Sequence, residues 1–330
     1  MKRQLKIIDK IIRGVKGSNS FAVGGHMRPD GDCIGSQLAL AFALRKIGKM
    51  VTVFNQDKMP EKLAFLDPEN ILKGPVKTQR YDCLIVIDCA NYERMGSVCD
   101  SVSQHDLVIN IDHHGSNSHF GDINWVDPKS TSSGELIYRL FKQAKWTITP
   151  QIADCLFTAI STDTGSFQYA TTRPSTYLTA AELLKRGANL SRICEEVYQS
   201  HPLSRAKLQR HMYNSFKIIE DKQIAYFWIR KTDYKRAGAS PDQSEGLIDH
   251  IRNILGVKIA CLFEEIEPEL TRVSLRSKMP ELNVSTIAAS FGGGGHLSAA
   301  GARIPGKQMI TQRQVLAAVK KSLATANGKV

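Results

Sequence analysis

The sequence lacks several features that would place it in other classes of protein. Its 330 residues contain no uninterrupted apolar run long enough to cross a bilayer, and the N-terminal segment, with Lys and Asp inside it, is unlike a signal peptide. The seven cysteines include no C-x-x-C pair, and their odd number argues against a disulfide framework. Internal repeats and low-complexity tracts are also absent. The sequence therefore predicts a cytoplasmic protein that has no membrane partner.

The composition is ordinary for a globular protein, except for its charge. Hydrophobic residues make up 42% and charged residues 23%, so a sizeable core can form, and the length is comfortable for two domains. The formal charge is +12 and the sequence pI is about 9.3. This balance favours an anionic partner such as a phosphate, although many basic proteins bind no nucleic acid.

Acids and imidazoles follow four apolar elements at the points where these elements end. The β-branched run 107–111 predicts a buried strand, the segments 21–25 and 83–87 predict two more, and 152–160 predicts an apolar helix. The polar residues that follow these elements are His26, Arg28, Asp30, Asp32, Asp88, Asp112, His113, His114 and Asp163. The carboxyl ends of parallel strands line the ligand crevice of open α/β sheets. Any one of these residues could be a turn cap or a solvated side chain, but the convergence of four elements favours a shared site.

Strands alternate with helices through the first 200 residues. This order predicts an α/β fold with a doubly wound, mostly parallel sheet. The polar, basic stretch after it predicts a partly helical linker, and a hairpin near 220–222, two strands and a last helix from Val284 predict a smaller α+β domain. We expect a catalytic domain at 1–199, a linker at 200–214 and a substrate-binding domain at 215–330, with the active site in the cleft between the domains.

The acids and imidazoles form a set that suits divalent metal ions. Four carboxylates in one crevice would repel one another strongly, and two divalent cations would neutralise them. Oxygen and imidazole donors without a thiolate favour Mn²⁺, with Mg²⁺ or Co²⁺ as alternatives. A bridging Asp88 would hold two metals roughly 3.5–4 Å apart, the spacing of two-metal hydrolases.

Other residues are candidates for phosphate binding. Arg28 and His114 flank the expected ligands; the alternatives are a surface ion pair for Arg28 and a hydrogen-bonded partner of a metal ligand for His114. The four glycines before His296 would expose backbone N–H groups to an anion, with a flexible hinge as the alternative. Arg276, at a predicted strand end, is a further phosphate candidate, with a structural salt bridge as its alternative.

Together these motifs resemble the DHH phosphoesterase superfamily. The resemblance rests on His26-x-x-x-Asp30-x-Asp32 with Gly35-Ser36, on Asp88, on Asp112-His113-His114 and on Asp163-x-Gly165. The run Gly293-Gly-Gly-His296-x-x-Ala-Ala-Gly301 is similar to the DHH-associated C-terminal domain. Within the superfamily, the short two-domain layout resembles the branch of oligoribonucleases (nano-RNases) that are also pAp phosphatases.

The resemblance implies a role for each matched residue. One metal would be held by His26, Asp30 and Asp88, and another by Asp32, Asp88, His113 and Asp163. Among the catalytic residues, Asp112 would orient the imidazoles, and His114, with Arg28, would contact the phosphate. The substrate-binding residues implied for the second domain are Arg276, Ser277, Gly293, Gly294, Gly295 and His296, of which Arg276 and His296 would grip a terminal phosphate.

The resemblance also implies an activity, that of a phosphodiesterase (exoribonuclease) and 3′(2′),5′-bisphosphate nucleotidase. It would convert short oligoribonucleotides to mononucleotides and pAp to AMP, with a hydroxide bridging two metals as the nucleophile. Its partners would be short RNA and pAp-type nucleotides, and a homodimer is compatible with the family. The alternatives are a cyclic or linear dinucleotide phosphodiesterase, a family II-like inorganic pyrophosphatase and a non-catalytic RNA-binding module.

Overall fold

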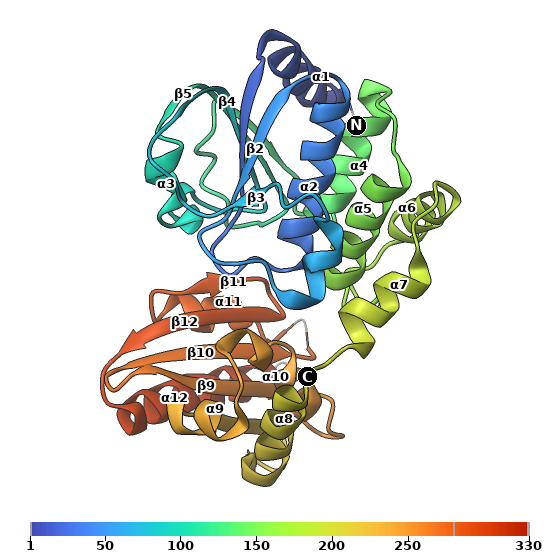
Figure 1. Cartoon of the computed structure of the whole chain (residues 1–330). Coiled ribbons are helices and arrows are strands. Elements are labelled where there is room, and N and C mark those ends of the chain that lie inside the picture. The colour runs from blue at the N-terminus through green and yellow to red at the C-terminus, as the bar shows by residue number, and fades with distance from the viewer. Residues whose placement is uncertain (1, 280, 329–330) are drawn as a thin grey trace. The chain divides into compact units, whose positions relative to one another are not determined.

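The computed structural model describes residues 2–279 and 281–328, and the chain divides into two compact units between Ser200 and His201 (Figure 1). None of the helices in this described part combines the length and the apolar character that a membrane span requires.

The first unit is built on a six-stranded parallel sheet. Its strands are β1 (Ser20–Gly24), β2 (Met50–Phe54), β3 (Leu72–Lys73), β4 (Arg80–Ile87), β5 (Gln104–Asp112) and β6 (Ile123–Val126), in the order β3-β2-β1-β4-β5-β6. The chain runs outward to one edge from β1 and to the other from β4. Ligands of open α/β sheets bind where the strand order reverses, so the carboxyl ends of β1 and β4 are the expected place for a site.

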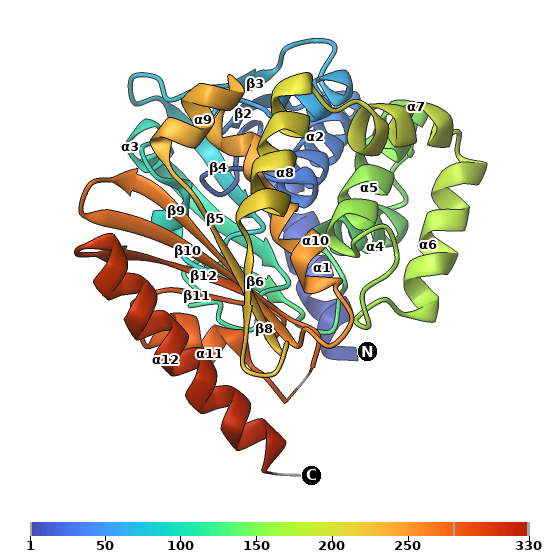
Figure 2. The same ribbon diagram turned by 90° about the horizontal axis from the view of Figure 1, so that it is seen from below.

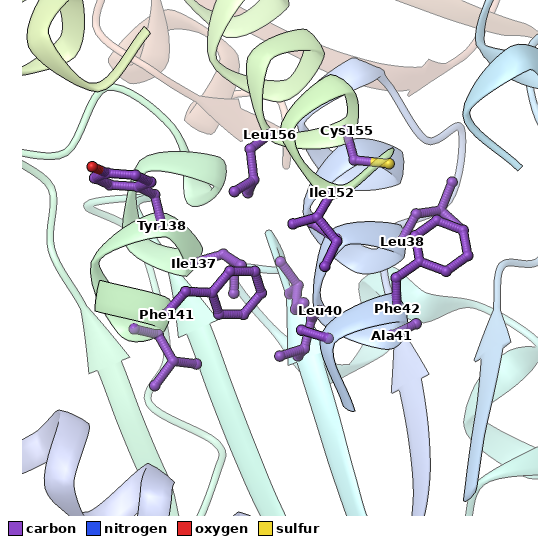
Figure 3. Close-up of a cluster of buried hydrophobic side chains, with 14 of the residues drawn as sticks. Leu38, Leu40, Ala41, Phe42, Ile137, Tyr138, Phe141, Ile152, Cys155 and Leu156 are labelled. Carbon is purple, nitrogen blue, oxygen red and sulfur yellow. The ribbon is translucent and has the colours of Figure 1, made fainter. Parts of the chain in front are cut away.

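Helices cover both faces of this sheet because alternate strand residues point to opposite sides. Cys83, Ile85 and Ile87 of β4 share a core with α1 (Lys2–Gly17), α2 (Gly31–Lys46), α4 (Ser133–Ala144) and α5 (Pro150–Asp163). Figure 3 shows part of this core, where side chains of α2, α4 and α5 meet above the strands. Leu84 and Val86 face a second core with α3 (Val98–Ser101) and the short helix Tyr92–Met95. The unit ends with α6 (Pro174–Lys185), α7 (Leu190–Cys194) and one turn at Glu195–Gln199.

The second unit is a mixed six-stranded sheet in the order β11-β12-β10-β9-β8-β7. Its strands are β7 (Lys217–Ile219), β8 (Ile224–Ile229), β9 (Ile259–Glu267), β10 (Leu270–Ser277), β11 (Gly294–Gly295) and β12 (Ala299–Pro305). One face carries α11 (Val284–Ala289) and α12 (Gln308–Asn327), and the other carries α8 (Leu203–Ser215), α9 (Lys231–Ala237) and α10 (Leu247–Arg252) (Figure 2). The predicted fold class is confirmed, since a doubly wound parallel sheet is followed by a smaller α+β unit.

The segment 200–214, predicted as a partly helical linker, is mostly helix α8, and from His201 onward it belongs to the second unit. The segment is polar and basic because it contains Arg205, Lys207 and Arg210, and this composition favours a linker. Leu208 and Met212, one helical turn apart, are nevertheless fully buried in the core beneath β8. The burial of these two apolar side chains makes the segment a helix of the second unit, despite the charged residues around them.

Replacing Leu208 by Ala is expected to destabilise the second unit by about 2–5 kcal/mol, because the change leaves a cavity in a closed core. Leu203, on the same helix but 72% exposed, is the matched control, and its replacement by Ala should change the stability by less than about 0.5 kcal/mol. Urea unfolding of the full chain measures both. Equal effects of the two changes would mean that the segment behaves as a linker.

Candidate metal centre

The loop between β1 and α2 presents the first group of polar side chains. Asp30 is the N-cap of α2, and its Oδ1 accepts the N–H of Cys33 at 3.0 Å. His26 is buried, and its Nδ1 donates to the carbonyl oxygen of Met27 at 2.8 Å. Because a carbonyl can only accept, this bond places a proton on Nδ1 and turns Nε2 toward the carboxylates. Burial alone would lower the pKa of His26, but Asp30 and Asp88 raise it to about 10.

Asp88 lies at the centre of the cluster. It directly follows β4 and has a φ of +59°, in the left-handed region that Asp and Asn tolerate better than most residues. Its Oδ2 lies 3.3 Å from Nε2 of His26, and its Oδ1 lies 3.4 Å from Nε2 of His113 and accepts the hydroxyl of Ser133 at 3.1 Å. Asp88 is thus the residue that joins the two imidazoles.

Asp32 is held by the N-terminus of α4. Its Oδ2 accepts the N–H of Ser133 at 2.7 Å, and its Oδ1 accepts the N–H of Gly134 at 2.9 Å and the hydroxyl of Ser36 at 3.1 Å. The positive end of a helix favours a carboxylate in this position. Burial nevertheless raises the pKa of Asp32, and the negative charge of Asp88 adds to the rise, so a nearby cation would favour the ionised form of this group.

His113 and Asp163 complete the cluster. Nε2 of His113 lies 3.3 Å from Oδ2 of Asp163 and 3.8 Å from Oδ2 of Asp32. Burial alone would lower the pKa of His113, but the charges of Asp163 and Asp88 outweigh it and raise the pKa. For Asp163 burial acts in the opposite direction and raises the pKa to about 7, although the charge of His113 opposes this rise. Asp32, His113 and Asp163 therefore bind protons more readily than usual, and a metal ion would compete with those protons.

The six residues expected as metal ligands all come together in the first unit. Two groups have donor atoms within 4.8 Å of one another, namely His26 with Asp30 and Asp88, and Asp32 with His113 and Asp163. The donors are carboxylate oxygens and imidazole nitrogens, which suit Mn²⁺, Mg²⁺ or Co²⁺. The repulsion among the buried carboxylates and the orientation of the ring nitrogens both fit a site for divalent ions.

Asp112 and His114 form a hydrogen-bonded pair beside this cluster. Asp112 is fully buried, and its Oδ1 accepts Nδ1–H of His114 at 2.7 Å and the backbone N–H of His113 at 2.9 Å. Its Oδ2 accepts the amide of Asn117 at 2.6 Å, and Asn117 also donates to Oδ1 of Asn110 at 2.8 Å. The carboxylate thus fixes the His114 ring, while Asn117 holds the carboxylate from the other side.

The sequence interpretation missed Ser133, Gly134 and Asn117. The first two lie at the start of α4, where Ser132 accepts the N–H of Glu135 at 3.1 Å. A Ser followed three residues later by Glu is a capping-box pattern, and it agrees with the helix that the sequence predicts over about 132–144. Nothing in the sequence pairs it with Asp32, which lies about a hundred residues earlier.

Arg28 is exposed on the β1–α2 loop, and its backbone N–H donates to Asp57 at 2.7 Å. Its contact with a phosphate stays a prediction.

The predicted substrate contacts of the second unit are partly committed to the fold. Nε of Arg276 lies 4.0 Å from Oδ1 of Asp249, the geometry of a weak ion pair. Ser277 is buried, and its hydroxyl donates to the carbonyl of Met279 at 2.9 Å while accepting the Met279 N–H at 3.0 Å. This local turn gives Ser277 a structural role.

The glycine run is a hairpin arm, with Gly294 and Gly295 paired to β12 as β11. The N–H groups of Gly292, Gly293 and His296 are donated to carbonyls of Ala289, Ala288 and Ala299. A Cβ at Gly293 would lie 2.1 Å from the carbonyl oxygen of Gly301, so close approach of the two arms requires glycine there. Three N–H groups of this segment are therefore used within the fold, and contact of the glycine run with an anion stays a prediction.

Adding Mn²⁺ to EDTA-treated protein is expected to raise Tm. At a hundredfold excess over Kd the gain is about 2.7 kcal/mol, or roughly 5–10 °C for a unit of this size. A proton on Asp163, whose pKa is raised to about 7, must leave before a metal binds. The shift in Tm should therefore be larger at pH 8 than at pH 6. Differential scanning calorimetry at both pH values measures the shift in Tm. An equal shift in an Asp88→Asn variant would contradict the assignment of this cluster to a metal site.

Comparisons with known proteins place the chain in a family. Residues 20–160 match the family model "DHH family, N-terminal domain" and residues 221–325 match the "DHHA1 domain". The chain is 31% identical to the bifunctional oligoribonuclease and PAP phosphatase NrnA of Thermus thermophilus, over 98% of this chain and 95% of that protein. The protein of the same name from Bacillus subtilis is 29% identical over 89% of this chain and 92% of its own.

Among solved structures, an exopolyphosphatase-related protein from Bacteroides fragilis has a TM-score of 0.88 and 26% identity, covering 98% of each chain. RecJ from Thermus thermophilus, with a TM-score of 0.56 and 12% identity, covers 98% of this chain and 55% of its own. At that identity, the likeness to RecJ shows the fold alone.

Proposed function

This chain belongs to the DHH family of phosphoester hydrolases, and we propose that it degrades very short oligoribonucleotides to mononucleotides and converts pAp to AMP. The observation that carries the proposal is the convergence of four carboxylates and two imidazoles around Asp88, at the switch point of the sheet. Relatives that match this chain over nearly its full length are named for both activities.

The chain's own residues would prepare the site for in-line attack on phosphorus. Met27 and Ser130 offer their carbonyl oxygens to Nδ1 of His26 and His113, which turns each Nε2 toward the carboxylates. When bound, two divalent cations would supply positive charge that polarises the phosphoryl oxygens and favours ionisation of a water nucleophile. Asp112 holds His114 in a fixed orientation, and we assign His114 to a phosphate oxygen of the substrate.

The test is a comparison of substrates in Mn²⁺, with EDTA controls. We would incubate the purified chain with 5′-labelled RNAs of two to five nucleotides, a 24-nucleotide RNA, pAp, pyrophosphate and polyphosphate. The proposal expects metal-dependent loss of the short RNAs and pAp, with the other three substrates spared. Turnover of pyrophosphate or polyphosphate alone would replace it with a phosphoanhydride hydrolase, and binding of RNA without turnover would replace it with a binding module.

Replacing Arg276 by Ala is expected to raise KM for pAp about tenfold or more, because a hydrogen bond to a charged group contributes roughly 1.5–3 kcal/mol. The value of kcat should change much less, since Arg276 is assigned to a phosphate that is not the one attacked. Arg303, exposed on the neighbouring strand β12, is the matched control for loss of a positive charge. An unchanged KM would leave the ion pair with Asp249 as the role of Arg276.

A further inference from the structure

A pocket of about 340 Å³ lies in the second unit between α8 and the start of α12. We call it the α8/α12 pocket; the residues that matter here are Lys217, Tyr226, Trp228, Arg230, Met309 and Gln312. It exists because β7 is short. The pairing of β7 with β8 ends at Tyr226, so that Trp228 lies beyond the end of the edge strand.

This pocket is separate from the predicted substrate contacts of the same unit. Trp228 packs with the core beneath α11 and α12. Leu275 points into that same core, so its neighbour Arg276 points to the opposite face of the sheet, where it approaches Asp249 of α10. Two strand spacings, roughly 10 Å, also separate β10 from β8. The glycine hairpin β11 lies at the other edge of the sheet.

The pocket has a rigid aromatic wall. The ring of Trp228 stacks on Phe263 with centroids 5.1 Å apart and an interplanar angle of 21°. Its Nε1–H donates to Oε1 of Gln312 at 2.5 Å, which fixes the rotation of the indole. Trp228 remains partly exposed and lines the pocket. A fixed, partly exposed indole is the kind of surface on which nucleobases stack, at about 1–3 kcal/mol per base.

The rim of the pocket is positively charged. Lys217 and Arg230 are exposed, and neither forms an ion pair with any residue within 2–279 and 281–328. The one carboxylate among the lining residues is Asp233, which already accepts the backbone N–H of Arg230 at 2.9 Å and lies 3.4 Å from His211. Residues 201–330 carry twenty Lys and Arg against eleven Asp and Glu, so most of the net charge of +12 belongs to this unit. The ligand should therefore be an anion.

We propose that the α8/α12 pocket binds one nucleotide unit, with the base against Trp228 and the phosphate between Lys217 and Arg230. A volume of about 340 Å³ lies at the lower end of the range for ligand pockets, roughly 300–1,000 Å³, and suits a single unit of this kind. The unit can come from a strand of single-stranded RNA or from a free mononucleotide. The site goes beyond the proposed hydrolysis, because it holds none of the groups that would catalyse it.

Tryptophan fluorescence tests this site directly, because Trp125 and Trp146 lie in the first unit and Trp228 is the remaining tryptophan. The full chain would be titrated in EDTA with AMP, adenosine, inorganic phosphate and a five-nucleotide oligoadenylate. EDTA prevents turnover, so a negative result is distinct from failure of the proposed hydrolysis. The variants are Trp228→Phe, Lys217→Ala and, as a matched control, Lys321→Ala, which removes an exposed charge nine residues beyond Gln312 on α12, about 14 Å away.

The proposal expects saturable quenching by AMP that disappears in Trp228→Phe, weakens about 3- to 10-fold in Lys217→Ala and is unchanged in Lys321→Ala. Adenosine and inorganic phosphate should each bind more weakly than AMP. An oligoadenylate that binds at least tenfold more tightly than AMP identifies RNA as the source, whereas equal affinities identify the mononucleotide. No saturable quenching, or quenching that survives in Trp228→Phe with a matching unfolding temperature, would overturn the proposal.

Discussion

Replacing Asp88 by Asn is expected to lower kcat for short RNA and pAp by at least about 1000-fold, which corresponds to roughly 4 kcal/mol of transition-state stabilisation. The carboxylate of Asp88 approaches both His26 and His113, at 3.3 and 3.4 Å. The change removes a negative charge from the centre of the candidate metal site and weakens the attraction for both cations. Steady-state kinetics in Mn²⁺ and metal titration by calorimetry measure the two consequences.

The substitution is chosen so that the fold survives it. Asn tolerates the left-handed conformation that Asp88 adopts, and its carbonyl oxygen can still accept the hydroxyl of Ser133. Burial alone would raise the pKa of Asp88, but the contacts with His113 and His26 hold it well below its usual range. The change therefore removes favourable contacts and should lower the unfolding temperature in EDTA, so kinetics are measured well below that temperature. Asp106→Asn, at an exposed position on β5, is the control for loss of charge alone. Near-normal kcat in Asp88→Asn with full metal affinity would show that the reaction takes place elsewhere.

The candidate ligands could be predicted because each follows the end of an apolar element. In a parallel sheet such ends gather at one edge, so the sequence alone predicts that His26, Asp88 and His113 converge, as they do. The groups that hold the ligands could not be predicted in the same way. Ser133 donates to Asp32 across 101 positions of sequence, and no local pattern encodes such a pairing.

The second unit was harder to predict, because its decisive residues are few. Leu208 and Met212 bury α8 although charged residues surround them, and the predicted last helix at Val284 is α11, which is followed by β12 and by the longer α12. Val315, Val319 and Leu323 of α12 recur at four-residue spacing and are buried, so a helical period was present in the sequence. The polar residues between them obscured it.

Gly35 shows how packing gives a residue a role that its local pattern did not indicate. Helix α2 begins at Gly31 with Asp30 as its N-cap. Gly35 therefore lies inside the helix, where it faces α5. A Cβ there would lie 2.4 Å from the carbonyl oxygen of Cys155 and 3.0 Å from Cβ of Ala159. The missing side chain allows α2 and α5 to approach closely.

Replacing Gly35 by Ala is accordingly expected to destabilise the first unit by about 3 kcal/mol, because the clash involves backbone that cannot rotate away. The added methyl group must push α2 from α5, and Asp32 and Asp163 lie on these two helices. Activity should therefore fall even at temperatures where the variant remains folded, since displacements of about 1 Å cost roughly 100-fold in rate. Gly17→Ala, at a helical position with no atom within 4 Å of the new Cβ, should be neutral or slightly stabilising. Urea unfolding and steady-state kinetics of both variants measure the two effects. Equal stability of the two variants would mean that α2 and α5 can move apart without loss of stability.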